Sequence, residues 1–486
     1  MTLNFKNKNI FASLFLIFIA VYCMFFLYKP GFIGYANNYD FVRHSSCIGL
    51  WSYIPDHPKG AGHPSAPSDK LLYDGDVIKG ACIKSSDNIS SYIIARFLSV
   101  GDTVSFIKLS SVKIAFLLFL SFVAIALSKS KLVPSLVLFS ILTEWIYLAY
   151  ANTLYGEFSV VSAFVLIIIC TYSLLYENNT KYSKLQALIL VVSIVWLGLS
   201  KQQWSYFSFL LVCVSFWVVF QRTLLKKVSF LFLFFSLISV SAFQIINKGS
   251  FKSEGSINSA NKINTFFHAV LPEATDQLKA LRTLDLPDRC YADIGKNWYH
   301  PEQNALNNCP EIQTASRAKL FKLFIQDPAT FYMPIVKFTD EMKLFYPDYL
   351  GLTVSGDVNA LKKFEYLKRI SISSVISKMK SSVFFMIALV FFIFALVTGL
   401  ILFFMPKRVP LRLASYMYLF TVGGLTTGYS ITSSVFGDGY IEAAKHAVLF
   451  LGGFYIQLIA LICILFFLAA SFFKKHKIPE LTAQLK

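Results

Sequence analysis

The sequence has few charged residues for its length. Asp, Glu, Lys and Arg make up 15% of the 486 residues, whereas soluble domains carry about 25%. The shortfall coincides with long apolar runs, and about 17–25 apolar residues are enough to cross a bilayer as a helix. This composition excludes an ordinary soluble protein and predicts an all-α polytopic membrane protein with about ten transmembrane helices.

Two long polar stretches, 29–111 and 247–381, interrupt the apolar runs and are predicted to be large, partly helical loops. Within the second loop, 315–332 and 360–379 mix apolar and basic residues at helical spacing, which is typical of amphipathic helices at a membrane surface. The predicted spans are 10–28, 112–128, 132–150, 158–176, 185–200, 204–220, 228–246, 382–404, 412–430 and 446–470.

These boundaries divide the chain into three parts. Residues 1–246 form an N-terminal transmembrane bundle that includes the first loop, 29–111. Residues 247–381 form the large second loop, and 382–486 contain the C-terminal transmembrane helices and tail. The first span ends at Lys29-Pro30 without a small-residue cleavage site, so we expect an uncleaved helix rather than a signal peptide.

The net charge of +18 does not indicate a nucleic-acid partner, because no basic stripe with interleaved aromatic residues lies outside the spans. With a cytoplasmic N-terminus, the six short inner segments are rich in Lys and Arg, whereas the short outer segments contain only Lys201 and Lys445. This bias predicts cytoplasmic termini and two extracytoplasmic loops, and the basic clusters beside the apolar runs suit contact with anionic membrane lipids. Spans 185–200 and 204–220 are separated by a very short turn, so either could instead be re-entrant.

The sequence has no CxxC spacing, which disfavours a zinc site. Four of the eight cysteines lie within predicted spans, where a free cysteine acts as a small hydrophobe. Two more lie in each large loop, and an oxidising compartment favours their pairing. We therefore predict disulfides Cys47–Cys82 and Cys290–Cys309.

Acidic and basic side chains gather at the predicted outer ends of the spans, whereas the inner ends carry almost only Lys and Arg. Transfer of a sugar from a lipid phosphate needs a base for the acceptor hydroxyl and cations for the leaving phosphate. The residue types fit this chemistry, and the candidates are Asp40, Arg43, His44, Glu157, Lys201, Gln202, Asp438, Glu442, Lys445 and His446.

Each candidate also has a purely structural interpretation. Asp40 could cap a helix, Glu157 could bind lipid headgroups, and Lys201 could anchor the chain at the membrane surface. Glu442 and Lys445 are three residues apart and could simply pair along a helix. These alternatives stay open on the sequence alone.

An acidic residue soon after the first span, a long late outer loop and about ten spans resemble the GT-C class of membrane glycosyltransferases. Within that class, segments 37–43, 155–158, 200–204 and 437–446 are similar to phage-encoded glucosyltransferases that convert the O-antigen serotype of enteric bacteria. The resemblance implies a bacterial inner-membrane enzyme with a periplasmic active site. It implies undecaprenyl-phosphate-linked glucose as donor and lipid-linked O-antigen repeats as acceptor.

The resemblance also implies roles for individual residues. The first-loop acid of the family, its catalytic base, corresponds to Asp40. Glu157 or Asp438 would orient the sugars, while Arg43, His44, Lys201, Gln202, Glu442, Lys445 and His446 are expected to bind substrate or the donor phosphate. Some relatives have a DxD motif where this chain has Asn38-Tyr39-Asp40, so we predict no metal and no cofactor.

Two other classes of function remain as alternatives. A flippase or transporter for lipid-linked sugars would need polar residues along a path through the membrane, whereas here the charges lie at one surface. An O-antigen polymerase or ligase would depend more on Arg and His in a large outer loop.

Overall fold

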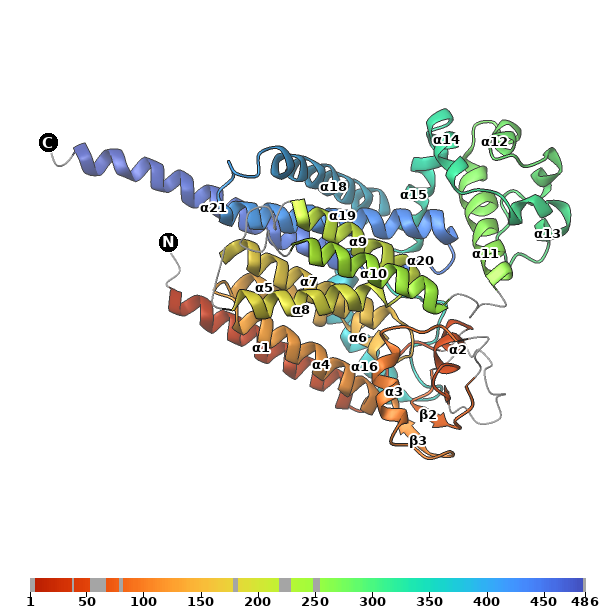
Figure 1. Cartoon of the computed structure of the whole chain (residues 1–486), viewed down its shortest axis with the longest axis horizontal. Helices are drawn as coiled ribbons and strands as arrows, with labels where there is room; N and C mark the ends of the chain where they lie inside the picture. The colour runs from red at the N-terminus through yellow and green to blue at the C-terminus, as the bar shows by residue number, and fades with distance from the viewer. Residues whose placement is uncertain are drawn as a thin grey trace.

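The computed structural model describes residues 5–36, 39–52, 67–77, 82–177, 182–217, 229–247 and 254–483. Its long helices run side by side in one bundle (Figure 1). Both chain termini lie at one end of the bundle, and both polar inserts lie at the opposite end (Figure 1). This arrangement agrees with two inserts on one side of a membrane and two termini on the other.

A helix lies in each of the ten predicted spans. Among the described residues, six helices are long and apolar enough to cross a membrane, or seven if the bent pair α5 and α6 counts as one span. The total of ten spans therefore stays a prediction. The bundle helices are α1 (Phe5–Tyr28), α4 (Phe106–Ala126), α5 (Leu132–Leu142), α6 (Trp145–Ala151), α7 (Glu157–Glu177), α8 (Ser183–Gly198), α9 (Gln202–Ser215), α10 (Ser229–Asn247), α18 (Ser381–Phe404), α19 (Leu411–Asp438) and α21 (Phe450–Ala483).

The predicted continuous span 132–150 is wrong in one respect, because it breaks into α5 and α6 with a bend of 72°. Glu144 lies at the break and is buried. Its carboxylate accepts hydrogen bonds from the Ser373 amide at 3.0 Å, the Ser373 hydroxyl at 2.7 Å and the Tyr455 hydroxyl at 2.6 Å. A buried carboxylate must be satisfied, and these donors come from distant elements that the local sequence does not reveal.

Helix α7 lies at the centre of the bundle. The apolar window that it contributes is entirely buried, and the helix packs against α4, α5, α8 and α19. A helix that is apolar on all sides needs such surroundings. Because α7 begins at Glu157, this central position brings that carboxylate to the middle of the insert-bearing end.

The first insert departs from the all-α prediction. It contains α2 (Tyr39–Ser45), α3 (Asn88–Ala95) and a three-stranded antiparallel sheet in the order β1-β2-β3. The strands are β1 (Leu50–Ser52), β2 (Lys70–Tyr73) and β3 (Thr103–Ser105), with Trp51 opposite Leu72 and Leu71 opposite Val104. Strands of three or four residues are too short to give a clear alternation of polar and apolar residues.

The second insert has two structural parts. Residues 254–326, here called the distal subdomain, form a separate apolar core around Phe266, Leu281 and Ile312. Its helices are α11 (Glu254–Ile263), the π-helix η3 (Asn264–Val270), η4 (Leu271–Glu273), α12 (Gln277–Thr283), η5 (Asp288–Asp293), α13 (Ala305–Asn308), η6 (Pro310–Gln313) and α14 (Ala318–Gln326). Helices α15 (Ala329–Glu341), α16 (Val358–Ile370) and α17 (Ile372–Ile376) follow.

The amphipathic helix α16 caps α1. The Lys363 ammonium donates to the carbonyls of Phe26 at 2.6 Å, Lys29 at 3.0 Å and Gly31 at 2.9 Å. The last carbonyls of a helix have no partner within the helix, and cations are favoured there. The second insert therefore packs back against the first helix instead of extending freely from the bundle.

Both inserts are held in place by covalent and backbone links. Cys47 is bonded to Cys82, and Cys290 to Cys309, which is the pairing predicted from the sequence. Between the inserts, Ile33 forms an antiparallel bridge with Thr353. The Ile33–Thr353 bridge and the Cys47–Cys82 disulfide therefore hold the chain on both sides of α2.

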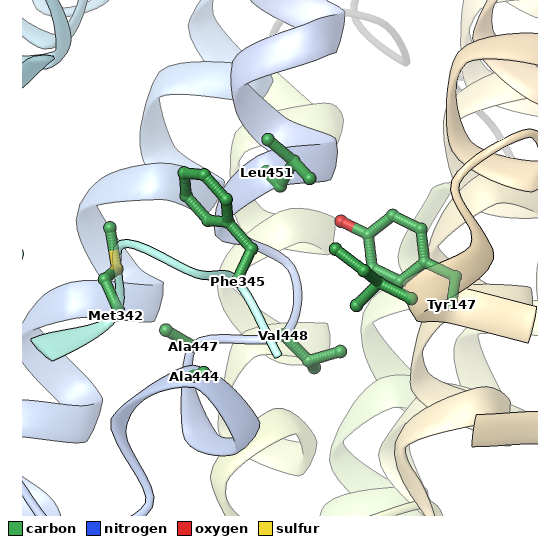
Figure 2. A pocket seen from close by; sticks show the side chains of 8 residues that line it. Tyr147, Met342, Phe345, Ala444, Ala447, Val448 and Leu451 are labelled. Atoms are coloured by element: carbon green, nitrogen blue, oxygen red, sulfur yellow. The ribbon is translucent and has the colours of Figure 1, made fainter. Parts of the chain in front are cut away.

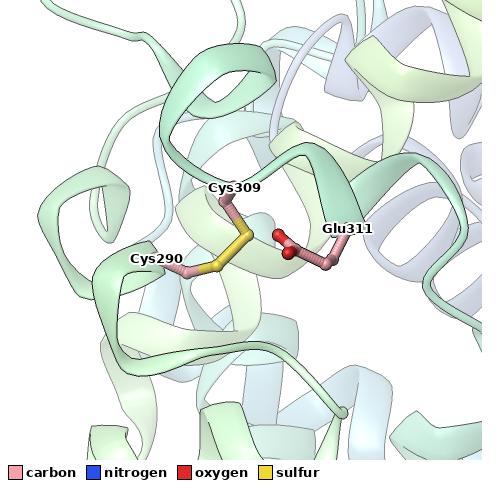
Figure 3. A group of neighbouring side chains, drawn as sticks. All are labelled: Cys290, Cys309 and Glu311. Carbon is pink, nitrogen blue, oxygen red and sulfur yellow. A yellow bond between two sulfur atoms is a disulfide. The ribbon is translucent and has the colours of Figure 1, made fainter.

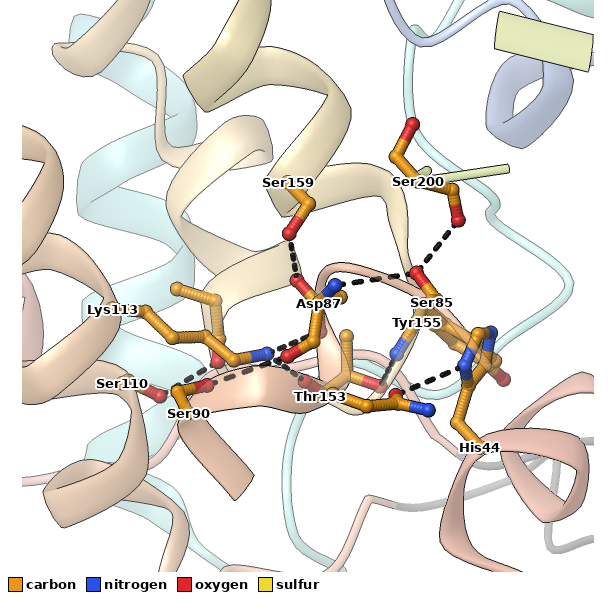
Figure 4. Close-up of polar contacts among 12 residues, drawn as sticks. His44, Ser85, Asp87, Ser90, Ser110, Lys113, Thr153, Tyr155, Ser159 and Ser200 are labelled. Atoms are coloured by element: carbon orange, nitrogen blue, oxygen red, sulfur yellow. Dashed lines mark hydrogen bonds and ion pairs between the residues drawn. The ribbon is translucent and has the colours of Figure 1, made fainter. Parts of the chain in front are cut away.

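A buried ion pair joins the first insert to the bundle. The Lys113 ammonium of α4 lies 2.6 Å from an Asp87 carboxylate oxygen, and their side chains are 4% and 2% exposed. Asp87 also accepts a hydrogen bond from Ser159 of α7 at 2.8 Å, and Lys113 donates to the Thr153 carbonyl at 3.1 Å (Figure 4). The pair therefore ties the segment after Cys82 to two bundle helices.

Replacing Lys113 with Met should leave the Asp87 carboxylate buried without its cation. Removing one partner of a buried pair costs about 3–5 kcal/mol, so we expect a large drop in the melting temperature of the full chain in detergent. Lys108→Met, on the exposed side of the same helix, should change stability by no more than about 0.5 kcal/mol. Equal melting temperatures for the two variants would show that the pair does not hold the insert.

Candidate functional site

Four of the predicted site residues lie together where α19 ends and α20 (Ala443–His446) begins. The Lys445 ammonium is 2.9 Å from a Glu442 carboxylate oxygen. The His446 Nε2 lies 3.4 Å from Asp438 and 3.6 Å from Glu442. Lys445 is almost fully buried, so its charge depends on this local pairing.

The backbone of this turn is unusual at Glu442. Its φ of 53° places a non-glycine residue in the left-handed region, which costs about 1–2 kcal/mol for an L-amino acid. Such strain occurs often at functional sites, where the surrounding structure maintains it. The left-handed conformation directs the chain from the end of α19 into α20, where Lys445 and His446 follow.

Glu157 and Lys201 form a second charged pair. The Lys201 ammonium lies 2.8 Å from a Glu157 carboxylate oxygen. Glu157 is the first residue of α7, where the partial positive charge of the helix N-terminus favours a carboxylate. The Glu157 side chain is 1% exposed, whereas that of Lys201 is 26% exposed and reaches the surface.

Two contacts connect the pairs into one site. The Lys445 ammonium lies 4.7 Å from the centre of the Tyr155 ring, two residues before Glu157. The Gln203 amide, two residues after Lys201, donates to the His446 carbonyl at 3.1 Å. The structure therefore brings together the predicted residues Glu157, Lys201, Asp438, Glu442, Lys445 and His446, and we call this set the charged cluster.

Helix α2 approaches the charged cluster from the first insert. The His44 Nδ1 is 3.2 Å from Asn88 Oδ1 (Figure 4), and a Cβ on Gly156 would lie 3.9 Å from His44 Cε1. Arg43 is partly buried, and its carbonyl accepts the Ile83 amide at 2.9 Å. The Asp40 backbone belongs to α2, but its side chain lies outside the described part of the structure.

Gln202 and Gln203 differ in their surroundings. The sequence analysis selected Gln202, but this residue is exposed. Gln203 instead donates to the Ser433 hydroxyl at 2.8 Å as well as to His446. At the N-terminus of α9 the residue facing α19 is thus Gln203, because successive helix positions point in different directions.

Tyr349 is a site residue that the sequence analysis missed. The Tyr349 residue is 46% exposed, but partial enclosure of its phenol and the neighbouring Glu442 carboxylate raise the pKa of Tyr349 well above its ordinary value. Tyr349 reaches the cluster because the following Gly351 carbonyl accepts the Ala36 amide at 2.9 Å. No local motif marks Tyr349, since its partner is 93 positions away in the chain.

A small, buried apolar recess lies within the core at this end of the bundle (Figure 2). Its walls come from α6, the segment after α15 and the junction of α20 with α21, and they include Tyr147, Phe345 and Val448. Ala444 also lines it, immediately before Lys445 in the chain. The charged cluster therefore lies directly against the apolar core of the bundle.

Within the described ranges, one group of potential metal ligands was found, formed by Cys290, Cys309 and Glu311 (Figure 3). The two sulfur atoms are bonded to each other, and a metal ligand must be a thiolate. Glu311 pairs with Arg289. This group is therefore a disulfide beside an ion pair rather than a metal centre.

The apolar helical bundle and its two polar inserts define a multi-pass helical membrane protein. The sequence model of the YfdI N-terminal transmembrane domain matches residues 2–484, and the chain belongs to this family. No curated protein and no solved structure shows significant similarity to the chain.

Gly439 packs closely against the distal subdomain. Its φ is 64°, and a Cβ there would lie 2.4 Å from the Asn264 carbonyl oxygen. We expect Gly439→Ala to destabilise the full chain by about 1–3 kcal/mol from backbone strain alone, with a further loss from the clash. Thermal unfolding and hydrogen exchange of 263–270 would measure both.

Two glycines serve as matched controls. Gly295 has a φ of 90° with open space around it, so Gly295→Ala measures strain without a clash. Gly437 lies in α19 with open space around it, so Gly437→Ala should be neutral or slightly stabilising. If Gly439→Ala costs no more than Gly295→Ala, the close packing on Asn264 is not important.

Proposed function

We propose that this protein is a membrane glycosyltransferase that moves a hexose, most simply glucose, from an undecaprenyl-phosphate donor to lipid-linked O-antigen repeats. The observation that carries the proposal is the charged cluster, in which carboxylates and cations meet at the insert-bearing end of an apolar bundle. Membership of the YfdI family supports it. The cluster would face the periplasm of a bacterial inner membrane, with both termini in the cytoplasm.

The reaction is a single displacement that inverts the anomeric carbon. Asp40 takes the proton from the acceptor hydroxyl, whose oxygen then bonds to the anomeric carbon. The bond between that carbon and the phosphate oxygen breaks, and its electron pair leaves with the lipid phosphate. The acceptor gains one hexose, and the carrier is released as undecaprenyl phosphate.

The other residues bind and orient the reactants. Lys445, His446 and Lys201 supply cations for the charge that grows on the leaving phosphate, assisted by Arg43. Glu157 or Asp438 orients the sugars through their hydroxyls. The lipid chain would lie against the exposed apolar faces of the bundle helices, several of which are largely unburied.

Asp40→Asn tests the proposed base. In cells that display O-antigen and supply undecaprenyl-phosphate-glucose, the wild type should add one hexose mass to each repeat. Asp40→Asn should abolish the addition, because an amide cannot accept the acceptor proton. Mass spectrometry of the released O-antigen gives the result.

Asp288→Asn is the matched control, since Asp288 lies on the exposed surface of the distal subdomain and should leave transfer intact. Substantial transfer by a folded Asp40→Asn protein would remove Asp40 as the base. No mass change with folded wild type would contradict a hexosyltransferase and favour a flippase, polymerase or ligase.

Lys445→Met tests stabilisation of the leaving phosphate. Removing one group that stabilises developing charge lowers kcat by about 10²–10³-fold, so we expect a loss of that size in a purified transfer assay. Lys362→Met, on the exposed face of α16, should retain wild-type activity. Because Lys445 is buried, size-exclusion profiles must match the wild type; a folded Lys445→Met with wild-type kcat would exclude this role.

A further inference from the structure

The distal subdomain is joined to the charged cluster through one buried side chain. Asn264, at the start of the π-helix η3, donates from its amide nitrogen to Asp438 Oδ1 at 2.9 Å. Its amide oxygen accepts the Trp298 backbone N–H at 2.8 Å. Asn264 is 2% exposed, so it links Asp438 directly to the segment around Trp298.

A second contact from the distal subdomain reaches the same turn. An Arg317 guanidinium nitrogen donates to the Gly437 carbonyl at 3.0 Å. Together with the close packing of Gly439 on Asn264, this contact holds residues 437–439 between two parts of the subdomain. The position of the distal subdomain is therefore defined relative to Asp438.

The segment around Trp298 forms a compact turn. The Asn297 carbonyl accepts the His300 amide at 3.1 Å, and the Asn297 side chain accepts the Tyr299 amide at 2.9 Å. The His300 Nδ1 accepts the Glu302 amide at 3.2 Å. The turn lies within the loop closed by the Cys290–Cys309 disulfide, so hydrogen bonds and a covalent link both restrict it.

This turn presents a large aromatic ring to solvent. Tyr299 is 71% exposed. Its backbone amide is nevertheless held by a hydrogen bond to the Asn297 side chain. Exposed aromatic residues commonly anchor membrane proteins at the lipid surface. Here α12 and α13 of the same subdomain lie beyond the ends of the bundle helices (Figure 1), which disfavours a lipid-facing role.

We propose that the turn 297–300 is a subsite for the acceptor saccharide, binding sugar units beyond the one that receives the hexose. A lipid-linked saccharide extends away from the membrane, in the direction in which the distal subdomain projects from the bundle. The Tyr299 ring offers a flat apolar face to a sugar ring, and the exposed His300 offers polar atoms to its hydroxyls. The inference rests on the proposed function and adds a location for acceptor recognition.

The test compares two exposed tyrosines of the same subdomain. Tyr299→Ala should raise the acceptor KM of the purified full chain about tenfold, with kcat changed less than twofold, because losing an aromatic stack weakens binding by about that factor. Tyr291→Ala is the control, since Tyr291 is 52% exposed and lies outside the turn. Tyr299→Trp should retain a low KM, because it keeps an aromatic face.

A binding measurement separates this inference from the proposed reaction. Saturation-transfer NMR with the full chain in nanodiscs uses oligosaccharides of one to three O-antigen repeats, without the lipid, as the probe. Binding by wild type and Tyr291→Ala, and its loss in Tyr299→Ala, would support the subsite even if no hexose is transferred. Equal binding by the two alanine variants, or no binding by wild type, would overturn it while leaving the transfer assay to decide the reaction.

Discussion

The cost of burying charge determines the architecture of the insert-bearing end. A carboxylate or ammonium taken out of water is stable only with a partner, and here three buried or partly buried carboxylates have contacts that join separate elements. Asp87 connects the first insert to α4 and α7, Glu157 connects α7 to the start of α9, and Glu442 connects the α19–α20 turn to the second insert through Tyr349. The same pairing that makes these charges tolerable thus assembles a site from segments far apart in the sequence.

The broad architecture could be predicted from the sequence because lipid imposes a simple rule. Backbone groups in a bilayer must be satisfied within a helix, so long apolar runs identify the bundle helices. The break at Glu144 could not be predicted, because the carboxylate is satisfied by Ser373 and Tyr455, more than 200 residues away. The short strands of the first insert were not predicted for a different reason. Leu50–Ser52 and Thr103–Ser105 are shorter than the alternating pattern of polar and apolar residues that identifies a strand.

The candidate site could be predicted in part. Once the helices were ordered, Glu157, Lys201 and the 438–446 segment were expected at one end, and the structure joins them through ion pairs and Tyr155. Tyr349 and Asn264 could not be identified in this way, because they lie in the second insert and meet the cluster only through tertiary contacts. Gln203 was missed for a local reason: adjacent positions at the start of α9 point in different directions, and only the structure shows which one faces α19.

The backbone conformation of Glu442 indicates that the α19–α20 turn needs a side chain at this position. Glycine would adopt a φ of 53° without penalty, yet the position holds a glutamate. The backbone cost is about 1–2 kcal/mol, and the Glu442 side chain, unlike a glycine, can pair with Lys445 and lie beside Tyr349. Phe345, also at positive φ, lies in the segment that carries Tyr349 and lines the apolar recess. Two strained residues thus lie where the charged cluster meets the apolar core of the bundle.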